Sequence, residues 1–343
     1  MICFAWHGFP QYAARCVGVF VKEAQERVVV VATRPNVPIE GMEKAAGCEV
    51  VWIDGDDDLR GIEALCGELP RVLFVSGWGT AAFNRYRDEV RAKGGKVIAM
   101  SDNNFQLSLR ECVKALRFRL RFRNKYDGYF VPGMSGKRLL KFYGVPSAKI
   151  RQGMYSADET LFVNGVSAEK REKKILFVGQ LNGRKNIVPF ARAFLAVNAK
   201  RGWTLEICGC GPDREALLRI GDGRKGLVVH DFVQPEALAK IYQSARVFAL
   251  PSIEEHWGLV VHEAALSGCV LLLSNRIGAG EDFLGLENGV VFNPYSMKGM
   301  GVAIEKVMEM SDEEVARASA ESVQLGNIIN KRLFVNGVKG FSS

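Results

Sequence analysis

Short apolar runs separated by helix-length intervals recur along the whole chain of 343 residues. The runs are rich in Val, Ile, Leu and Phe and lack strict alternation, which is typical of parallel strands buried on both faces of a sheet. In the first half they are Ile2–Trp6, Val28–Thr33, Val50–Ile53, Val72–Ser76, Val97–Ser101 and Gly128–Val131. In the second half they are Ile175–Gly179, Thr204–Cys208, Leu227–Val229, Val247–Leu250, Val270–Ser274 and Val290–Phe292. The repeated order of strand and helix predicts two doubly wound, Rossmann-like α/β domains that face each other across a cleft.

The chain is long enough for two hydrophobic cores, and a polar stretch divides its halves. Asp158–Lys174 is polar and ends in a run of charged residues, as a linker would. We therefore expect a first domain over residues 1–160 and a second over residues 161–325. Ser311-Asp312-Glu313-Glu314 is a capping-box pattern that opens a final helical region, and residues 326–343 are predicted to cross back onto the first domain.

Composition and charge narrow the class of protein. Hydrophobic residues make up 48% of the chain and charged residues 24%, as in a soluble globular protein. The net charge of +8 favours an acidic partner. The N-terminus lacks the basic region of a signal peptide, and no apolar run approaches the roughly 20 residues that a membrane-spanning helix needs. We expect a cytoplasmic protein that can lie on the inner face of the membrane without crossing it.

The stretch Pro251–Ala264 is the strongest chemical signal. It places two carboxylates, Glu255 and Glu263, eight residues apart, and Gly258 lies between them. An apolar strand precedes the stretch, and Leu259–Leu266 is predicted to be a helix whose N-terminus begins at Gly258. Unpaired N–H groups and the helix dipole attract an anion there. A ligand with phosphates in its middle and hydroxyls at both ends, such as a nucleotide-sugar, suits this arrangement.

The loops after three earlier strands complete a pocket of the same kind. Gly179 opens a loop that carries the adjacent cations Arg184 and Lys185, the usual counter-charges for a diphosphate. Cys208–Asp213 is a tight glycine-containing loop, and Asp231–Pro235 follows the next strand and ends in a proline suited to the first turn of a helix.

In this order, these motifs resemble the donor-binding domain of retaining GT-B glycosyltransferases of family 4. The resemblance covers Ile175 to about Ala303. It consists of Gly-Gln-Leu followed by Arg-Lys-Asn, Gly-x-Gly-Pro, Gln-Pro-Glu-x-Leu, a strand ending in Pro-Ser, and Glu-x7-Glu. It continues through Gly278-Ala279-Gly280-Glu281-Asp282 and Glu287-Asn288-Gly289.

The resemblance implies a role for each matching residue. Glu255 would hold the hydroxyls of the donor sugar, and Glu263 would bind the ribose. Lys185, with Arg184 beside it, would neutralise the diphosphate. The phosphates would also meet the amides of Gly258, Leu259 and Val260, and the base would meet the main chain near Phe232 and Val233.

The chain departs from the family pattern at one position of this pocket. Many members have Arg directly after the first glycine, where this chain has Gln180. We expect Arg184 to supply the missing charge.

The first domain is expected to bind the acceptor. His7-Gly8 follows the first strand, in the position of the family's acceptor-side glycine loop, without the usual Gly-Gly pair. His7 is either a ligand-facing residue or an ordinary hydrogen-bonded loop residue. Where family members carry a histidine after the fifth strand, this chain has Ser101-Asp102-Asn103-Asn104, so Asp102 is the candidate base or positioner for the acceptor hydroxyl.

The segment from Arg110 to Arg121 carries a row of cations. Arg110, Lys114, Arg117 and Arg121 recur at i, i+4, i+7 and i+11, and therefore form one basic face of a helix. The face is either simply solvated or docks onto anionic lipid headgroups, which attract such cations. Nucleic acid is not expected as a partner, because no nucleic-acid-binding module is present.

No metal site or other cofactor is predicted. Asp54–Asp58 resembles the metal-binding Asp-x-Asp of GT-A enzymes, but the second Rossmann-like half favours a solvated acidic turn. His256 and His262 are expected to be wall or structural residues, since no third ligand stands at a suitable spacing.

The predicted function is transfer of a sugar from a UDP- or GDP-sugar to a glycan or lipid-linked glycan, with retention and without metal. Family analogy suggests lipopolysaccharide or other surface-polysaccharide assembly. Two alternatives remain open: a GT-B enzyme that hydrolyses or 2-epimerises a nucleotide-sugar, and a non-catalytic lipid- or glycan-binding module.

Overall fold

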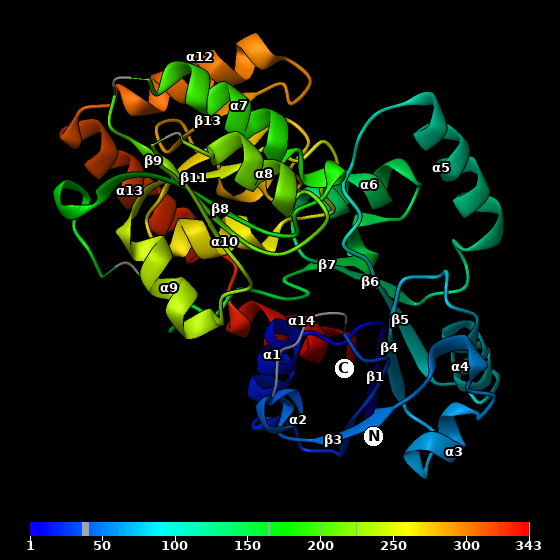
Figure 1. Cartoon of the computed structure of the whole chain (residues 1–343). Helices are drawn as coiled ribbons and strands as arrows, with labels where there is room; N and C mark the ends of the chain where they lie inside the picture. Colours follow the sequence, from blue (N-terminus) through cyan, green and yellow to red (C-terminus); the bar gives the residue numbers. More distant parts are fainter. Residues whose placement is uncertain (36–40, 164, 200, 224, 343) are drawn as a thin grey trace. The chain divides into compact units, whose positions relative to one another are not determined.

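The computed structural model of the protein describes residues 1–35, 41–163, 165–199, 201–223 and 225–342. The chain forms two compact units, each with its own parallel sheet (Figure 1). The first unit is Met1–Ser156 together with Asn330–Ser343, and the second is Ala157–Ile329. The chain therefore passes between the units twice, once after Ser156 and once after Ile329. Within the described residues, no helix is long and apolar enough to cross a membrane.

Within the described residues, the sheet of the first unit has seven parallel strands in the order β3-β2-β1-β4-β5-β6-β7. They are β1 (Ile2–Trp6), β2 (Val28–Ala32), β3 (Glu49–Trp52), β4 (Val72–Ser76), β5 (Lys96–Met100), β6 (Gly128–Val131) and β7 (Ile150–Gln152). The first six lie where the apolar runs predicted them. Sequence reasoning missed β7, because an edge strand of three residues with one buried side chain leaves no apolar run.

Helices cover both faces of this sheet. They are α1 (Gln11–Val21), α2 (Met42–Ala46), α3 (Ile62–Cys66), α4 (Ala81–Ala92), α5 (Leu109–Arg121), α6 (Met134–Phe142) and the C-terminal α14 (Lys331–Ser342). One face packs against α3 to α6, and α1 and α14 contact each other on the other face. Phe334 of α14 stacks on Phe4 and Phe130, with ring centroids 6.0 and 5.7 Å away. The last helix is therefore part of the core of the first unit.

In the part of the second unit that the structure describes, the sheet has six parallel strands in the order β10-β9-β8-β11-β12-β13. They are β8 (Glu172–Val178), β9 (Thr204–Cys208), β10 (Leu227–His230), β11 (Ala245–Leu250), β12 (Val270–Ser274) and β13 (Gly289–Phe292). All six were predicted from the apolar runs. Buried apolar side chains fill β11 and β12 almost without interruption and make up the last four residues of β8, as a sheet covered on both faces requires.

The helices of the second unit follow the strands in alternation. They are α7 (Ile187–Val197), α8 (Arg214–Gly221), α9 (Pro235–Ser244), α10 (Leu259–Leu266), α11 (Gly280–Phe283), α12 (Met297–Met308) and α13 (Asp312–Gly326). The helix predicted over Leu259–Leu266 is confirmed residue for residue. The capping box is also confirmed, because the Ser311 hydroxyl accepts from the Glu314 amide and the Glu314 carboxylate accepts from the Ser311 amide. The prediction of two doubly wound α/β domains is correct.

Both sheets contain a point where the winding direction reverses. It lies between β1 and β4 in the first unit and between β8 and β11 in the second. In open α/β sheets, ligands bind beyond the carboxyl ends of the strands at such a point, where the neighbouring loops diverge. The loops after β1, β4, β8 and β11 are therefore the places where this topology predicts ligand binding.

Candidate active site

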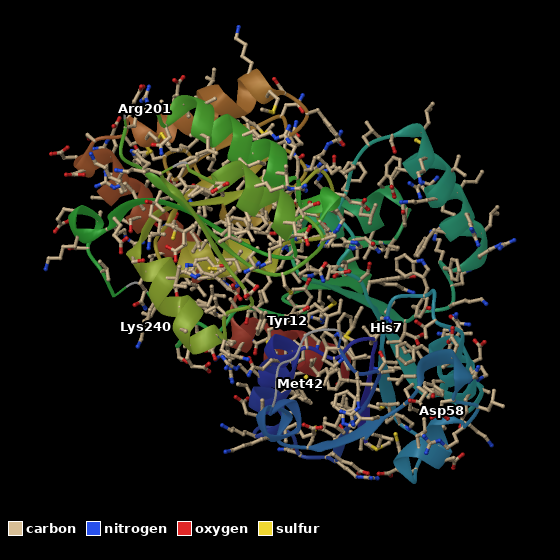
Figure 2. All side chains as sticks on the ribbon, viewed as in Figure 1. His7, Tyr12, Met42, Asp58, Arg201 and Lys240 are labelled. Atoms are coloured by element: carbon tan, nitrogen blue, oxygen red, sulfur yellow. The ribbon has the colours of Figure 1, made fainter. Side chains whose placement is uncertain are left out.

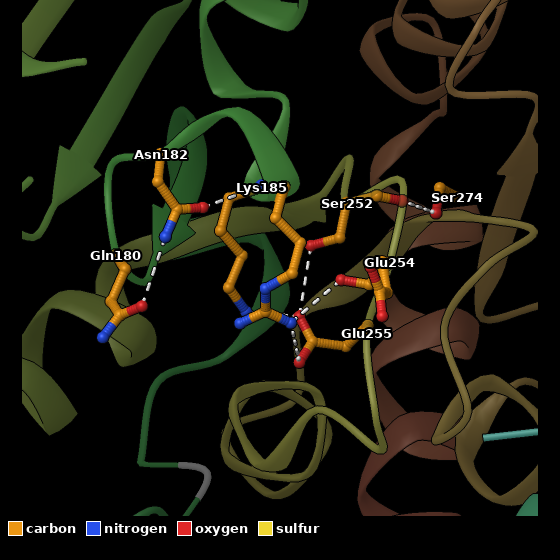
Figure 3. Close-up of polar contacts among 8 residues, drawn as sticks. Gln180, Asn182, Lys185, Ser252, Glu254, Glu255 and Ser274 are labelled. Carbon is orange, nitrogen blue, oxygen red and sulfur yellow. Dashed lines mark hydrogen bonds and ion pairs between the residues drawn. The ribbon is translucent and has the colours of Figure 1, made fainter. Parts of the chain in front are cut away.

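An ion pair joins the loops after β8 and β11, the two strands at the reversal point of the second unit. The Nζ atom of Lys185 donates to Oε2 of Glu255, and both side chains are buried (Figure 3). Lys185 ends a short 3-10 turn, Gly183–Lys185, and the Asn182 side chain caps that turn by accepting from the Lys185 amide at 3.2 Å. The loop sequence thus fixes the lysine before any ligand arrives.

A second cation and a hydroxyl complete the surroundings of Glu255. A guanidinium nitrogen of Arg184 lies 3.6 Å from Oε1 of Glu255 and donates to the Glu254 carbonyl at 3.0 Å. The Ser252 hydroxyl donates to Oε2 of Glu255 at 3.1 Å. Two cations against one carboxylate leave the cluster with a net charge of +1. A neighbouring diphosphate would meet that surplus charge.

Three of the residues predicted to act on the donor therefore come together in the structure. Gln180, where many family members have arginine, instead accepts from the Asn182 amide at 3.2 Å (Figure 3). The guanidinium of Arg184 points toward the loop after β11. The backbone carbonyl of Arg184 accepts from the Ile253 amide of that loop at 2.9 Å. Sequence reasoning missed Ser252 and Asn182 as supporting residues. The Pro-Ser ending of the strand and the asparagine three residues before Lys185 were the available signals.

Gly258 sits at the N-cap of α10 with φ of +98°, a conformation that strongly favours glycine. A Cβ at this position would lie 3.3 Å from Cγ of Glu255, so a side chain would also crowd the carboxylate. The first amides of the helix, those of Leu259 and Val260, have no acceptor within the helix. They begin the helix directly after the Glu255 loop, as predicted for a phosphate site.

The loop before α10 is also tied to the loop after β12. The Trp257 carbonyl accepts from the Ala279 amide at 2.8 Å, and the buried Trp257 indole donates to Asp282 at 3.0 Å. The Ser274 hydroxyl at the end of β12 donates to the Ser252 carbonyl at 2.6 Å. Three strand-ending loops thus hold Glu255 and Gly258 in place.

Glu263 has a different set of partners. It is half-buried in the second turn of α10 and accepts from the Tyr242 hydroxyl of α9 at 3.0 Å. Burial and then the charge of Glu263 raise the pKa of Tyr242 well above its usual range, so this hydroxyl remains a donor. Glu255 is held by cations and Glu263 by a phenol. The two carboxylates therefore differ in their environment as well as in their position.

Two glycines bring the loops after β8 and β9 into backbone contact. A Cβ on Gly209 would lie 1.9 Å from the Gly179 carbonyl oxygen, and one on Gly211 would lie 2.4 Å from that of Leu181. The Leu181 amide donates to the Cys210 carbonyl at 2.8 Å in the space that the glycines leave. This hydrogen bond holds the loop after β8, which starts at Gly179, against the loop after β9.

Phe232 and Val233 lie between β10 and α9, and both are half-buried. Their strand is at the edge of the sheet, whereas Lys185 and Glu255 follow its two central strands. The predicted contact of their main chain with a base stays a prediction.

The first unit has a pocket of about 360 Å³ beyond the carboxyl ends of its central strands. Residues after β1, β4 and β5 line it together with two aromatic residues, Tyr12 and Tyr155, whose ring centroids are 4.9 Å apart. The full lining is Trp6, His7, Gly8, Tyr12, Ser76, Gly77, Gly79, Thr80, Met100, Ser101, Asp102, Asn103, Met154 and Tyr155. Figure 2 labels His7 and Tyr12. The pocket brings His7, Gly8 and Asp102 together, as expected for residues of one site.

Hydrogen bonds fix the loop that carries His7. The His7 amide donates to the Ser76 hydroxyl and the Gly8 amide to the Thr33 hydroxyl, each at 2.7 Å. Gly8 has φ of +60°, which favours glycine at this turn. Sequence reasoning missed Tyr12, Ser76 and Tyr155, because their positions around the pocket depend on the tertiary fold.

The acidic turn after β3 already has protein partners. Asp58 pairs with Arg60, whose hydrogen bonds lower the pKa of Asp58 to about 2, and Asp56 accepts from the Ala82 amide at 2.9 Å. Across the described residues, no group of three His, Cys, Asp or Glu side chains is arranged to hold a metal ion.

His262 is buried, and backbone groups occupy both of its ring nitrogens. Nδ1 accepts from the Ala157 amide at 3.1 Å, and Nε2 lies 2.8 Å from the Gly326 carbonyl. Burial lowers the pKa of His262 to about 4, so the ring is neutral. These contacts give it the structural role that the sequence predicted.

Residues 159–323, nearly all of the second unit, match the family described as glycosyl transferases group 1. This match covers slightly less than half of the chain. A relative described as an uncharacterized glycosyltransferase, MJ1607 of Methanocaldococcus jannaschii, is 30% identical over 151 residues, or 43% of this chain and 38% of that protein. The chain spans less than half the length of the curated relatives it matches.

Solved structures extend the likeness to the whole chain at the level of fold. The sucrose-phosphate synthase of Thermosynechococcus elongatus superposes with a TM-score of 0.74 at 15% identity, covering 100% of this chain and 98% of that one. The Anabaena protein Alr3699/HepE, solved in complex with UDP, gives 0.76 at 12% identity, covering 99% and 98%. The fold is therefore the GT-B fold of these glycosyltransferases.

Proposed function

We propose that the protein is a retaining glycosyltransferase. It transfers a sugar from a UDP- or GDP-sugar to a hydroxyl of a glycan or lipid-linked glycan. The observation that carries this proposal is the cluster of buried Lys185 and Glu255 with half-buried Arg184 beside the N-terminus of α10. Its place at the winding reversal of a glycosyl transferases group 1 domain supports the proposal. So does the UDP bound to a protein of the same fold.

Each part of the cluster has a task in the reaction. The bond between the anomeric carbon and the diphosphate oxygen breaks, and its electron pair moves onto the leaving oxygen. Lys185, Arg184 and the first amides of α10 stabilise that charge without a metal ion. Glu255, fixed by Lys185 and Ser252, accepts hydrogen bonds from the sugar hydroxyls. Retention follows from the family resemblance, in which the acceptor attacks from the face that the diphosphate leaves.

The nucleoside would bind farther along the same unit. Glu263 accepts hydrogen bonds from the ribose hydroxyls while Tyr242 keeps its carboxylate oriented. The main chain at Phe232 and Val233 meets the base. This division assigns the sugar to Glu255 and the nucleotide to Glu263, in agreement with their different partners.

The acceptor would use the pocket of the first unit. Asp102 receives or orients the proton of the attacking hydroxyl, and His7 contributes a second polar group. Tyr12 and Tyr155 offer aromatic surface for a sugar ring. A lipid-linked acceptor in surface-polysaccharide or lipopolysaccharide assembly would make this a cytoplasmic enzyme that works at the inner face of the membrane.

Nucleotide binding is the first test of the proposal. Thermal unfolding is followed with UDP, GDP and their sugar conjugates, and the stabilising donor is then incubated with and without glycan acceptors. Acceptor-dependent release of the nucleoside diphosphate, with formation of a new glycoside, is the expected result. Release at the same rate without acceptor would identify a hydrolase instead, and conversion of the donor to its epimeric nucleotide-sugar would identify a 2-epimerase. Binding without release or epimerisation would identify a non-catalytic module.

A further inference from the structure

Helix α5 carries an exposed apolar stripe on the side that faces away from the protein. At 100° per residue, four of its apolar side chains fall within an arc of about 60°. They are Leu109, Val113, Leu116 and Leu120, with exposed fractions of 88, 68, 60 and 79%. The buried face of the helix, formed by Glu111, Ala115 and Phe118, lies on the opposite side. A stripe of this kind on one helix marks a binding surface for an apolar partner.

The cations of α5 border this stripe. Arg110, Lys114, Arg117 and Arg121 are all exposed and centre about 100° around the helix from it. Glu111 is the one acidic residue of the helix, and it is buried against Tyr143 and pairs with Lys114 at 3.1 Å. The solvent-facing surface of α5 therefore combines apolar and cationic side chains with no exposed carboxylate.

The helix is held firmly on the first unit. Phe118 packs against the rings of Trp78 and Tyr143, at centroid distances of 5.2 and 5.0 Å. Arg119 donates to the Phe142 carbonyl at 2.8 Å and to that of Tyr143 at 3.2 Å. Because one face of α5 is anchored in this way, the exposed stripe lies on a helix that is fixed to the first unit.

We infer that α5 is an interfacial helix that binds the surface of an anionic lipid bilayer. The stripe enters the boundary between headgroups and acyl chains, and the row of cations contacts the phosphates of the headgroups. The inference goes beyond the basic face predicted from the sequence, which docks by charge alone. At 1.5 Å per residue the helix is about 20 Å long and lies in the plane of the interface.

The cations of α5 favour an anionic bilayer over a second copy of this chain as the partner of the helix. Pairing two α5 stripes would bring two rows of four cations together, on a protein with a net charge of +8. Anionic headgroups instead complement those rows. The inference does not depend on the transfer reaction, so it stands or falls separately from the proposed function.

The test measures sedimentation of the full chain with vesicles of phosphatidylcholine and phosphatidylglycerol, and with phosphatidylcholine alone, at low and high salt. One variant, Leu116→Ser with Leu120→Ser, removes half of the stripe. A second, Arg117→Glu with Arg121→Glu, reverses two cations. The matched control, Leu59→Ser with Leu286→Ser, removes two leucines outside α5 that are more exposed still, at 84 and 98%.

We expect the wild type and the control to bind the anionic vesicles and to retain part of that binding at high salt. The stripe variant should bind about tenfold more weakly and lose its binding at high salt, because only charge remains. The cation variant should lose binding to anionic vesicles. Wild-type-like binding of the stripe variant would overturn the insertion of the stripe. A wild-type dimer that the stripe variant converts to a monomer, measured by light scattering, would overturn the bilayer as partner.

Discussion

The two candidate binding regions differ in the kind of contacts that surround their candidate residues. In the second unit, Glu255 is already held by Lys185, Arg184 and Ser252, and α10 begins directly after it. In the first unit, the pocket around Asp102 and His7 is lined by many short polar and aromatic side chains. A diphosphate leaving group imposes the same charge problem for every sugar, whereas acceptors differ in shape. Under the proposed function, a few residues in a fixed order can therefore preorganise the donor side, whereas the residues of the acceptor side have to vary with the shape of the acceptor.

The largest expected effect is at Glu255. Glu255→Ala removes the carboxylate that we propose binds the sugar hydroxyls, and it leaves Lys185 without that ion-pair partner. The turnover number should fall about a thousandfold, while nucleotide affinity changes by no more than about threefold. Kinetics with the stabilising donor and calorimetry with the free nucleotide measure the two quantities. Glu254→Ala is the matched control, because that neighbouring side chain is exposed and only its carbonyl is used. Equal turnover of both variants would contradict the role of Glu255.

Removing the buried cation should have the next largest effect. Lys185→Met deletes one charge that is proposed to stabilise the leaving group, which should cost about 3 kcal/mol of barrier, or about a hundredfold in turnover. The exposed lysine of α9, Lys240 (Figure 2), provides the control Lys240→Met. If Lys185→Met weakens donor binding but leaves turnover intact, the lysine acts on the ground state alone.

Asp102 tests the acceptor side of the comparison. Asp102→Asn should lower acceptor-dependent transfer about tenfold to a hundredfold and leave nucleotide affinity unchanged. Glu63→Gln, on the exposed side of α3, controls for the loss of one negative charge from the first unit. A loss of nucleotide affinity in Asp102→Asn would contradict the separation of donor and acceptor residues between the two units.

Glu263 should show a smaller effect of a different kind. Glu263→Ala removes the hydrogen bonds assigned to the ribose and should weaken nucleotide binding about tenfold, or 1.4 kcal/mol by calorimetry. Glu263→Gln retains an acceptor for the Tyr242 hydroxyl and should bind more tightly than the alanine variant. If Glu255→Ala weakens nucleotide binding as much as Glu263→Ala does, the division of labour between the two carboxylates is wrong.

The sequence predicted features that depend on local pattern. Twelve strands appear as apolar runs, because a buried parallel strand needs apolar residues on both faces. The order of the donor motifs predicted Lys185, Glu255 and Glu263 as donor-binding residues, since each follows a strand end or lies on a helix at a fixed spacing. In the structure, the side chains of Lys185 and Glu255 form an ion pair, although the two residues are 70 positions apart in the sequence.

Features that depend on packing could not be predicted in the same way. Tyr242 reaches Glu263 only because α9 and α10 are neighbours, and Tyr155 joins the pocket from a loop far along the chain. The stripe of α5 escaped notice for a related reason. Leucines at helical spacing usually mark a buried face, and here the spacing cannot show that Glu111 and Phe118 face the core instead.

The smallest predicted effect concerns the pH dependence of the second unit. The pKa of buried His262 is about 4, below the value of about 6.5 expected when the chain is unfolded. Between these values the unfolded chain binds a proton that the folded chain does not, so folding stability falls as the pH drops. Lowering the pH from about 7 to about 5.5 should therefore remove about 1 kcal/mol of stability through this group.

His262→Gln isolates this contribution. The glutamine does not titrate, so the variant should lose less stability than the wild type over the same pH interval, even if it is less stable at neutral pH. Denaturant unfolding of the full chain at each pH gives the two slopes. His230→Gln is the matched control, because that histidine is half-buried beside Glu206 in the same unit. Identical slopes for His262→Gln and the wild type would contradict a buried neutral histidine that holds Ala157 and Gly326.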